Sequence, residues 1–202
     1  MGKYLPLPTR IANDADCAAL GEVVAGAGKE CQDVIMITLG TGVGGGIILD
    51  GNIYEGKGIG GSELGHMVIV ENGEPCTCGR RGCLEAYASA TALVREAKKS
   101  TGYILTPQEI YAGAGQGDRL LKDVVDTYIR RLGIGIVNIA NIFRPQMVLI
   151  GGGISGQGES LTRPLKEIVR ENCFGGDKGQ IPEIEIATLG NEAGMIGAAS
   201  LI

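Results

Sequence analysis

Three cysteines within eight positions constrain this chain more than any other feature. The segment "CTCGRRGCLE" (76–85) holds Cys76, Cys78 and Cys83, while the other three cysteines are scattered singly. His66, the single histidine of the chain, stands ten residues before Cys76. A loop this short cannot keep its three thiols far apart. The folded chain must therefore bond them to one another, bind them to a metal, or leave them as neighbouring free thiols.

A metal site is the interpretation that uses the whole cluster. A disulfide between Cys76 and Cys78 would be strained and would leave the third thiol unpaired. Zinc prefers four tetrahedral ligands, and thiolates with an imidazole suit it well. We therefore favour a structural Zn²⁺ site made by His66, Cys76, Cys78 and Cys83, with a chance cluster of free thiols as the alternative. Four protein ligands would leave no position for a catalytic water.

Composition narrows the class of protein. Apolar residues make up 44% of the 202 residues and charged residues 20%, as in an ordinary globular protein. A net charge of −5 argues against a nucleic-acid partner, because phosphate binding needs a basic face. No run of 18 apolar residues predicts a membrane segment, and residues 1–10 lack the apolar core of a signal peptide. Clustered rather than evenly spread cysteines favour a reducing, cytoplasmic location.

The 35 glycines gather in short clusters rather than in a repeat. The clusters include "GTGVGGG" (40–46), "GKGIGG" (56–61) and "GGGISGQG" (151–158). Glycine lets the backbone turn tightly and lets its N–H groups approach a ligand. The first cluster is not a Walker loop, because no Lys-Ser/Thr pair follows it.

Strand and helix patterns alternate along the chain and predict an α/β fold with a mixed sheet. Apolar runs predict a hairpin over 33–39 and 45–51, and further strands over 67–70, 146–150 and 183–188. "TPQE" (106–109) has the residues of a helix-capping box. Helices are predicted after that box and over 86–99, 119–143, 159–172 and 192–202.

The segment "ELGHMVIVENGEPCTCGRRGCLE" (63–85) resembles the signature of the ROK family, which comprises sugar kinases and sugar-responsive repressors. The signature reads E-x-G-H followed by C-x-C-G-x-x-G-C-x-E. Other landmarks of that family follow the same order, and the resemblance covers nearly the whole chain: "NDADCAALGE" (13–22), "TLGTGVGGGIILDG" (38–51) and "LIGGGIS" (149–155). The segment "CGRRGCLEAYASATAL" (78–93) is similar in sequence to the glucokinase-like branch of the family.

The resemblance implies a fold and an organisation. Residues 1–202 would form the C-terminal, larger lobe of a two-lobed actin-like ATPase (ribonuclease H-like) fold, with a structural zinc loop over 66–85. The final helix, about 192–202, would pack toward an N-terminal lobe. The family's first phosphate loop, D-x-G-G-T, is not found in residues 1–32. We therefore expect an incomplete form that phosphorylates sugar poorly by itself, and a homodimer formed through the larger lobe.

The resemblance also implies an activity, the ATP-dependent phosphorylation of a hexose, most simply of glucose to glucose 6-phosphate. Asp14 would be the catalytic base, and the sugar ligands would be Asn13, Glu63, His66 and Glu85. His66 would then serve both the metal and the sugar. Without the resemblance, Asn13 and Asp14 would be helix caps and the glutamates solvated surface charges.

The nucleotide side of the site follows from the same resemblance. Thr41 and Gly42 would contact the phosphates of ATP, which carries Mg²⁺, and Gly152 and Gly153 would lie on the adenosine side. A glycine hairpin that binds nothing is the alternative for the first pair.

Two positions depart from the family pattern, and several other functions share the signature. Asp16 stands where the family often has asparagine, and Ala12 where a glutamate is frequent. The alternatives are a ROK-type sugar-responsive transcriptional regulator, a kinase for N-acetylmannosamine, N-acetylglucosamine or fructose, and a zinc-stabilised dimerisation domain that binds no ligand.

Overall fold

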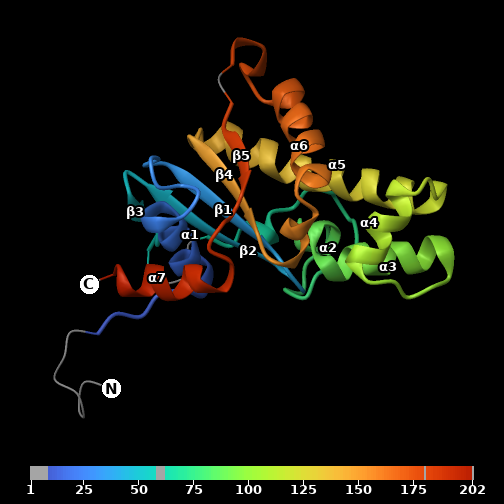
Figure 1. Cartoon of the computed structure of the whole chain (residues 1–202), viewed down its shortest axis with the longest axis horizontal. Helices are drawn as coiled ribbons and strands as arrows, with labels where there is room; N and C mark the ends of the chain where they lie inside the picture. Colours follow the sequence, from blue (N-terminus) through green and yellow to red (C-terminus); the bar gives the residue numbers. More distant parts are fainter. Residues whose placement is uncertain (1–8, 58–61, 180, 202) are drawn as a thin grey trace.

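A five-stranded mixed sheet forms the centre of the protein, as predicted (Figure 1). The computed structural model describes residues 9–57, 62–179 and 181–201. Residues 1–8 of the predicted lobe, the end of the "GKGIGG" turn (58–61) and Ile202 at the end of the predicted final helix lie outside the described residues. The strands are β1 (Val34–Leu39), β2 (Val43–Leu49), β3 (Asn52–Ile53), β4 (Met147–Gly151) and β5 (Glu183–Ile186).

The strand order is β3-β2-β1-β4-β5. The β1–β2 hairpin is antiparallel, whereas β4 pairs parallel to β1 and β5 pairs parallel to β4. The carboxyl ends of β1 and β4 therefore lie at the same edge of the sheet. In a sheet of this kind, ligands bind outside the carboxyl ends of the parallel strands.

Alternate residues of β1 enter two separate apolar cores, one on each face of the sheet. Ile35, Ile37 and Leu39 pack in the larger core with α5 (Arg119–Phe143) and α6 (Glu159–Asn172). Val34 and Met36 pack on the opposite face with α1 (Asp14–Ala25). Both faces of the central strand are thus buried, which explains why five of its six residues are apolar.

A group of short helices covers the first half of α5, away from the sheet (Figure 1). The predicted single helix over 86–99 is wrong, because the chain breaks at Ser89, whose side chain accepts a hydrogen bond from Ala92 N and caps a new helix. The capping box of Thr106 and Glu109 is confirmed. The three helices are α2 (Glu85–Ala88), α3 (Ala90–Thr101) and α4 (Pro107–Gly115).

The predicted strand over 67–70 is also wrong. Val68 makes one isolated bridge to Cys83 and does not join the sheet. The N–H groups of Ile69 and Val70 both donate to Gly82 O, so the segment closes the cysteine loop instead. Four short 3₁₀ helices complete the described structure, η1 (Leu64–His66), η2 (Gly153–Gln157), η3 (Gly176–Lys178) and η4 (Gly190–Glu192). Within the described residues, no helix has the length and apolar character that crossing a membrane requires.

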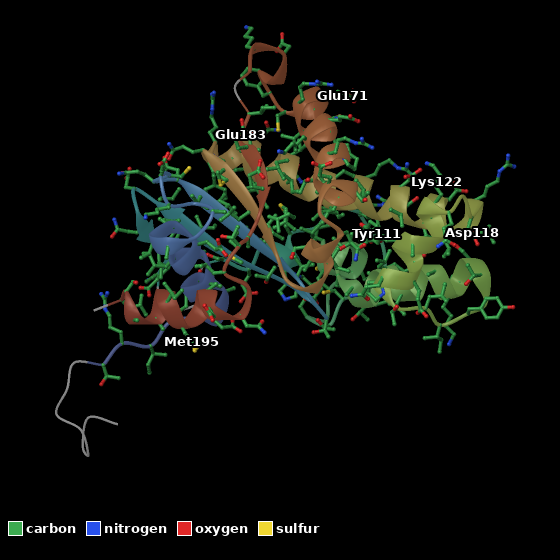
Figure 2. All side chains as sticks on the ribbon, viewed as in Figure 1. Tyr111, Asp118, Lys122, Glu171, Glu183 and Met195 are labelled. Atoms are coloured by element: carbon green, nitrogen blue, oxygen red, sulfur yellow. The ribbon has the colours of Figure 1, made fainter. Side chains whose placement is uncertain are left out.

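The final helix, α7 (Ala193–Ala199), packs directly on α1 (Figure 1). A Cβ added at Gly197 would lie 1.7 Å from Cys17 O, so the two backbones touch. The buried carboxylate of Glu22 also ties α1 to the turn before α7, because its Oε1 accepts a hydrogen bond from Leu189 N at 2.7 Å. Met195 projects from the outer side of α7 and is 68% exposed (Figure 2).

The contact between α1 and α7 predicts that Gly197→Ala destabilises the protein. The added methyl group would clash with backbone rather than with a movable side chain, and overpacking of this kind costs about 1–3 kcal/mol. Urea unfolding measures the change in free energy. Gly194→Ala in the same helix is the matched control, because a Cβ there meets no atom within 4 Å. Equal unfolding free energies for the two variants would contradict the prediction.

Candidate functional site

His66 lies between the cysteine loop and an open pocket. It ends η1, and η1 rests on the backbone of β2, since a Cβ at Gly65 would come within 2.1 Å of Val43 O. The Nδ1 atom of His66 lies 3.5 Å from Cys76 Sγ. Its Nε2 atom faces the other way, 3.9 Å from a carboxylate oxygen of Glu63. One imidazole therefore joins the two parts of the site.

The predicted zinc ligands come together. One ligand atom from each of His66, Cys76, Cys78 and Cys83 lies within 4.8 Å of the others. A tetrahedral zinc with Zn–S bonds of about 2.3 Å and a Zn–N bond of about 2.0 Å would place two sulfur atoms about 3.8 Å apart, and a sulfur and a nitrogen about 3.5 Å apart. The Cys78–Cys83 sulfur distance is 3.7 Å, and the Cys76–His66 distance is 3.5 Å. The donor set fits a tetrahedral zinc in chemistry, and these two distances match the spacing such a site needs, while all four ligand atoms lie within 4.8 Å of one another.

Glycines and an arginine shape the loop around these ligands. Gly79 and Gly82 have φ values of 85° and 81°, which side-chain-bearing residues rarely adopt. At Gly82 a Cβ would also lie 1.7 Å from Val70 O. Arg80 donates from Nη2 to His66 O at 3.1 Å. This hydrogen bond folds the cysteine loop back onto His66, which also lines the pocket.

The thiols of the cluster differ in their readiness to ionise. A hydrogen bond from the backbone of Arg80 lowers the pKa of the Cys78 thiol to about 6. Burial, together with the neighbouring thiols, raises the pKa of Cys83 to about 12. Three adjacent thiolates repel one another, so full ionisation of the cluster requires a cation among them.

Most of the predicted sugar and nucleotide residues line one open pocket at the carboxyl end of β1, namely Asp14, Thr41, Gly42, Glu63, His66, Glu85 and Gly152. Asn13 lines an adjoining pocket, which Asp14 and Glu63 also line. Gly153 lines neither pocket. The fold thus brings residues from five segments of the chain to one edge of the sheet.

Asn13 and Asp14 begin α1 at this pocket. Asn13 is the N-cap, and its side chain accepts a hydrogen bond from Ala15 N at 2.8 Å, so the predicted capping role is confirmed. Asp14 occupies the first helical position, and its Oδ1 accepts from the same N–H at 2.8 Å. The start of a helix favours a negative charge, which suits a carboxylate at this position. These capping hydrogen bonds therefore orient the two side chains while Asp14 still lines the open pocket and Asn13 the adjoining one.

Glu85 is held by protein donors rather than by solvent alone. Its Oε1 accepts a hydrogen bond from Thr77 Oγ1 at 2.7 Å, and its Oε2 accepts one from Val43 N at 3.1 Å. Burial disfavours the charged form, but these hydrogen bonds outweigh it, and the pKa of Glu85 lies below its ordinary value. The pocket therefore contains a fixed negative charge.

The glycines of the hairpin, and Gly152 after β4, allow close packing as well as tight turns. A Cβ at Gly42 would lie 2.5 Å from Glu85 Oε2, and one at Gly152 would lie 2.5 Å from Leu39 O. Farther along β2, a Cβ at Gly45 would meet Leu64, and one at Gly46 would lie 2.6 Å from Ala15 O. The glycine run thus lets η1 and α1, the elements that carry His66 and Asp14, lie directly on the strand.

Two residues of the site went unrecognised in the sequence. Thr77 reaches Glu85, but nothing in the pattern marks a threonine between two cysteines. Asp16 was noted only as a departure from the family pattern. It is 2% exposed, and its Oδ1 has no hydrogen-bond partner within the described residues. Burial raises the pKa of Asp16, and the charges of Glu55 and Glu63 raise it further.

Comparisons with known proteins agree with this geometry. The family model described as "ROK family" matches residues 1–202. A glucokinase of Halalkalibacterium halodurans is 39% identical over 211 residues, covering 97% of this chain and 64% of that protein. A ROK family glucokinase from Streptomyces griseus, solved in complex with glucose and AMPPNP, matches with a TM-score of 0.86 at 36% identity, covering 99% of this chain and 70% of that one.

A regulator is similar as well. A xylose repressor of Caldicellulosiruptor bescii is 32% identical over 209 residues, covering 97% of this chain and 52% of that protein. The chain therefore spans just under two thirds of the Halalkalibacterium glucokinase and about half of the repressor. The mixed sheet is consistent with the expected actin-like ATPase fold.

The spacing of the four ligand atoms predicts one zinc per chain, lost on Cys83→Ser. Removing a thiolate should weaken zinc binding by more than about 100-fold, because even changes to groups around metal ligands cost 10- to 100-fold. Metal analysis of the purified protein by mass spectrometry measures the occupancy. Cys173→Ser is the control, since Cys173 lies outside the cluster and, like Cys83, is buried. Full occupancy in the Cys83 variant would show that the cluster is not the zinc site.

The burial of Asp16 predicts a pH-dependent stability that Asp16→Asn removes. The raised pKa means that the folded state holds this proton more tightly than the unfolded chain does. The wild type therefore loses stability as pH rises through the folded pKa. The variant should gain on the order of 1 kcal/mol over the wild type at pH 8.5, and less near pH 4, close to the ordinary carboxyl pKa of 3.8, in urea unfolding. Asp123→Asn, on the exposed side of α5, should show no such trend.

Proposed function

Because the chain belongs to the ROK family, we propose that its pocket binds a hexose for phosphorylation by ATP, with glucose the favoured substrate and glucose 6-phosphate the product. The position of His66 is the observation that carries this proposal. One ring nitrogen faces the thiols, and the other faces Glu63 in the same pocket as Asp14. A metal-anchored imidazole beside two carboxylates is suited to a ligand with several hydroxyl groups.

Asp14 would act as the general base. Its carboxylate would take the proton of the sugar 6-hydroxyl as that oxygen attacks the terminal phosphorus of ATP, and ADP would leave. A positioned base typically contributes about 10²–10⁴ in rate. Asn13, Glu63, His66 and Glu85 would hold the other hydroxyls. Glu85 keeps capacity for this role, because each carboxylate oxygen can accept more than one hydrogen bond.

The nucleotide would occupy the edge of the sheet where β1 and β4 end. Thr41 and Gly42 lie in the hairpin turn, and Gly152 and Gly153 follow β4. Backbone N–H groups of such turns bind phosphate oxygens, and Mg²⁺ would enter with the nucleotide. The Streptomyces griseus relative, solved with glucose and AMPPNP, supports this arrangement.

Zinc at His66, Cys76, Cys78 and Cys83 would be structural. Bound through Nδ1 of His66, it would fix the imidazole orientation that leaves Nε2 for the sugar. The similarity to a xylose repressor supports a second candidate, a sugar-responsive regulator that uses the same pocket for sensing. A kinase for N-acetylmannosamine, N-acetylglucosamine or fructose would share the machinery, and a substrate panel separates these sugars.

Asp14→Asn is expected to reduce glucose-dependent ATP turnover by about 10²–10⁴-fold while glucose affinity stays within a few-fold, because the base acts on the proton being transferred. A coupled assay and calorimetry measure the two quantities. Glu183→Gln is the control. Glu183 begins β5, and this end of the sheet lies opposite the edge that carries the pocket (Figure 2). Glucose binding without any binding of AMPPNP would favour the regulator over the kinase.

A further inference from the structure

The turn of the glycine hairpin, residues 40–43, is held by the segment that directly follows the cysteine loop. Val43 N donates to Glu85 Oε2 at 3.1 Å. Ala90 N donates to Gly40 O at 2.8 Å, and Thr91 Oγ1 donates to Thr41 O at 2.8 Å. Three contacts from residues 85–91 therefore hold both sides of the turn.

Glu85 is the member of this segment that also reaches back into the cysteine loop. Its Oε1 accepts a hydrogen bond from Thr77 Oγ1 at 2.7 Å, and Cys76 Sγ lies 3.6 Å from the same oxygen. Thr77 stands between two of the zinc-site cysteines. One carboxylate thus has one oxygen bonded to the loop and the other bonded to the hairpin.

The geometry leaves this carboxylate little freedom. The position of a Cβ at Gly42 lies 2.5 Å from Glu85 Oε2, so the hairpin backbone packs against the charged oxygen itself. Hydrogen bonds to an ionised acceptor are about twice as strong as those between neutral groups. A rotation of Glu85 that breaks the Thr77 bond would therefore also disturb the bond to Val43 N.

We propose that Thr77 is a positioning residue, whose hydroxyl holds Glu85 against the hairpin turn and so couples the cysteine loop to the phosphate-binding side of the site. The coupling itself is a property of the fold, and its consequence for the nucleotide rests on the function proposed above. Filling the metal site would then order the hairpin turn as well as His66.

Amide hydrogen exchange of Val43, followed by NMR, tests the coupling without any ligand. In Thr77→Val, which keeps the size of the side chain and removes the donor, Val43 should exchange about tenfold faster, the effect of losing one hydrogen bond to a charged group. Thr77→Ser should restore the wild-type rate. The amides of Ile35 and Ile37, inside β1, should not change in either variant, and Thr127→Val, an exposed threonine on α5, should behave as the wild type.

Three results would overturn the proposal. These are an unchanged Val43 rate in Thr77→Val, a failure of Thr77→Ser to restore the rate, or loss of zinc from the valine variant, since Thr77 would then act on the metal rather than on Glu85. Calorimetry with AMPPNP and glucose extends the test. Weaker binding of AMPPNP to Thr77→Val at full zinc occupancy is expected. If the wild type binds neither ligand, the proposed function fails, while the exchange rates still decide the role of Thr77.

Discussion

The close approach of backbones around β2 is the constraint on which the site depends. Gly45 and Gly46 leave no side chains between the strand and the elements on its two faces, so Leu64 of η1 rests on one face of the strand and Ala15 of α1 on the other. Those two elements carry His66 and Asp14. A single methyl group on the strand would push one of them outward, and a shift of about 1 Å in a catalytic group can cost 10²-fold in rate. The glycine run therefore fixes the positions of His66 and Asp14, although the glycines themselves carry no side chain in the pocket.

The cysteine loop must position polar groups such as His66 and Glu85, although it has little apolar core of its own. Val68 is 48% exposed and Cys78 is exposed, so apolar burial alone does little to hold the loop. Backbone hydrogen bonds to Gly82 and the contact from Arg80 to His66 O take that role, and a metal bound to the four clustered side chains would add to it. The loop also favours a bound cation, because burial raises the pKa of the Cys83 thiol and the thiol ionises readily only when a positive charge is close.

Sequence patterns predicted those parts of the fold that depend on interactions between residues close together in the chain, such as helix periodicity and helix caps. The periodic helix over 119–143 matches α5, and the capping box at Thr106 and the N-cap at Asn13 form as expected. The strand over 67–70 was wrong because closure of the loop onto Gly82 overrides an apolar run. The contacts of Thr77 and the burial of Asp16 could not be foreseen, since both arise from segments that meet only in the folded chain.

The packing of α1 on α7 ties the two ends of the described chain together. The helix that begins at Asp14 touches backbone at Gly197 and binds Leu189 N through Glu22, contacts that span more than 160 residues of sequence. Contacts of such long range form late and slow the folding of a domain. During synthesis, α1 is made before α7, so the contacts between the two helices can form only after most of the described chain has left the ribosome. The helix that carries Asp14 into the pocket is therefore fully packed only after α7 has been made.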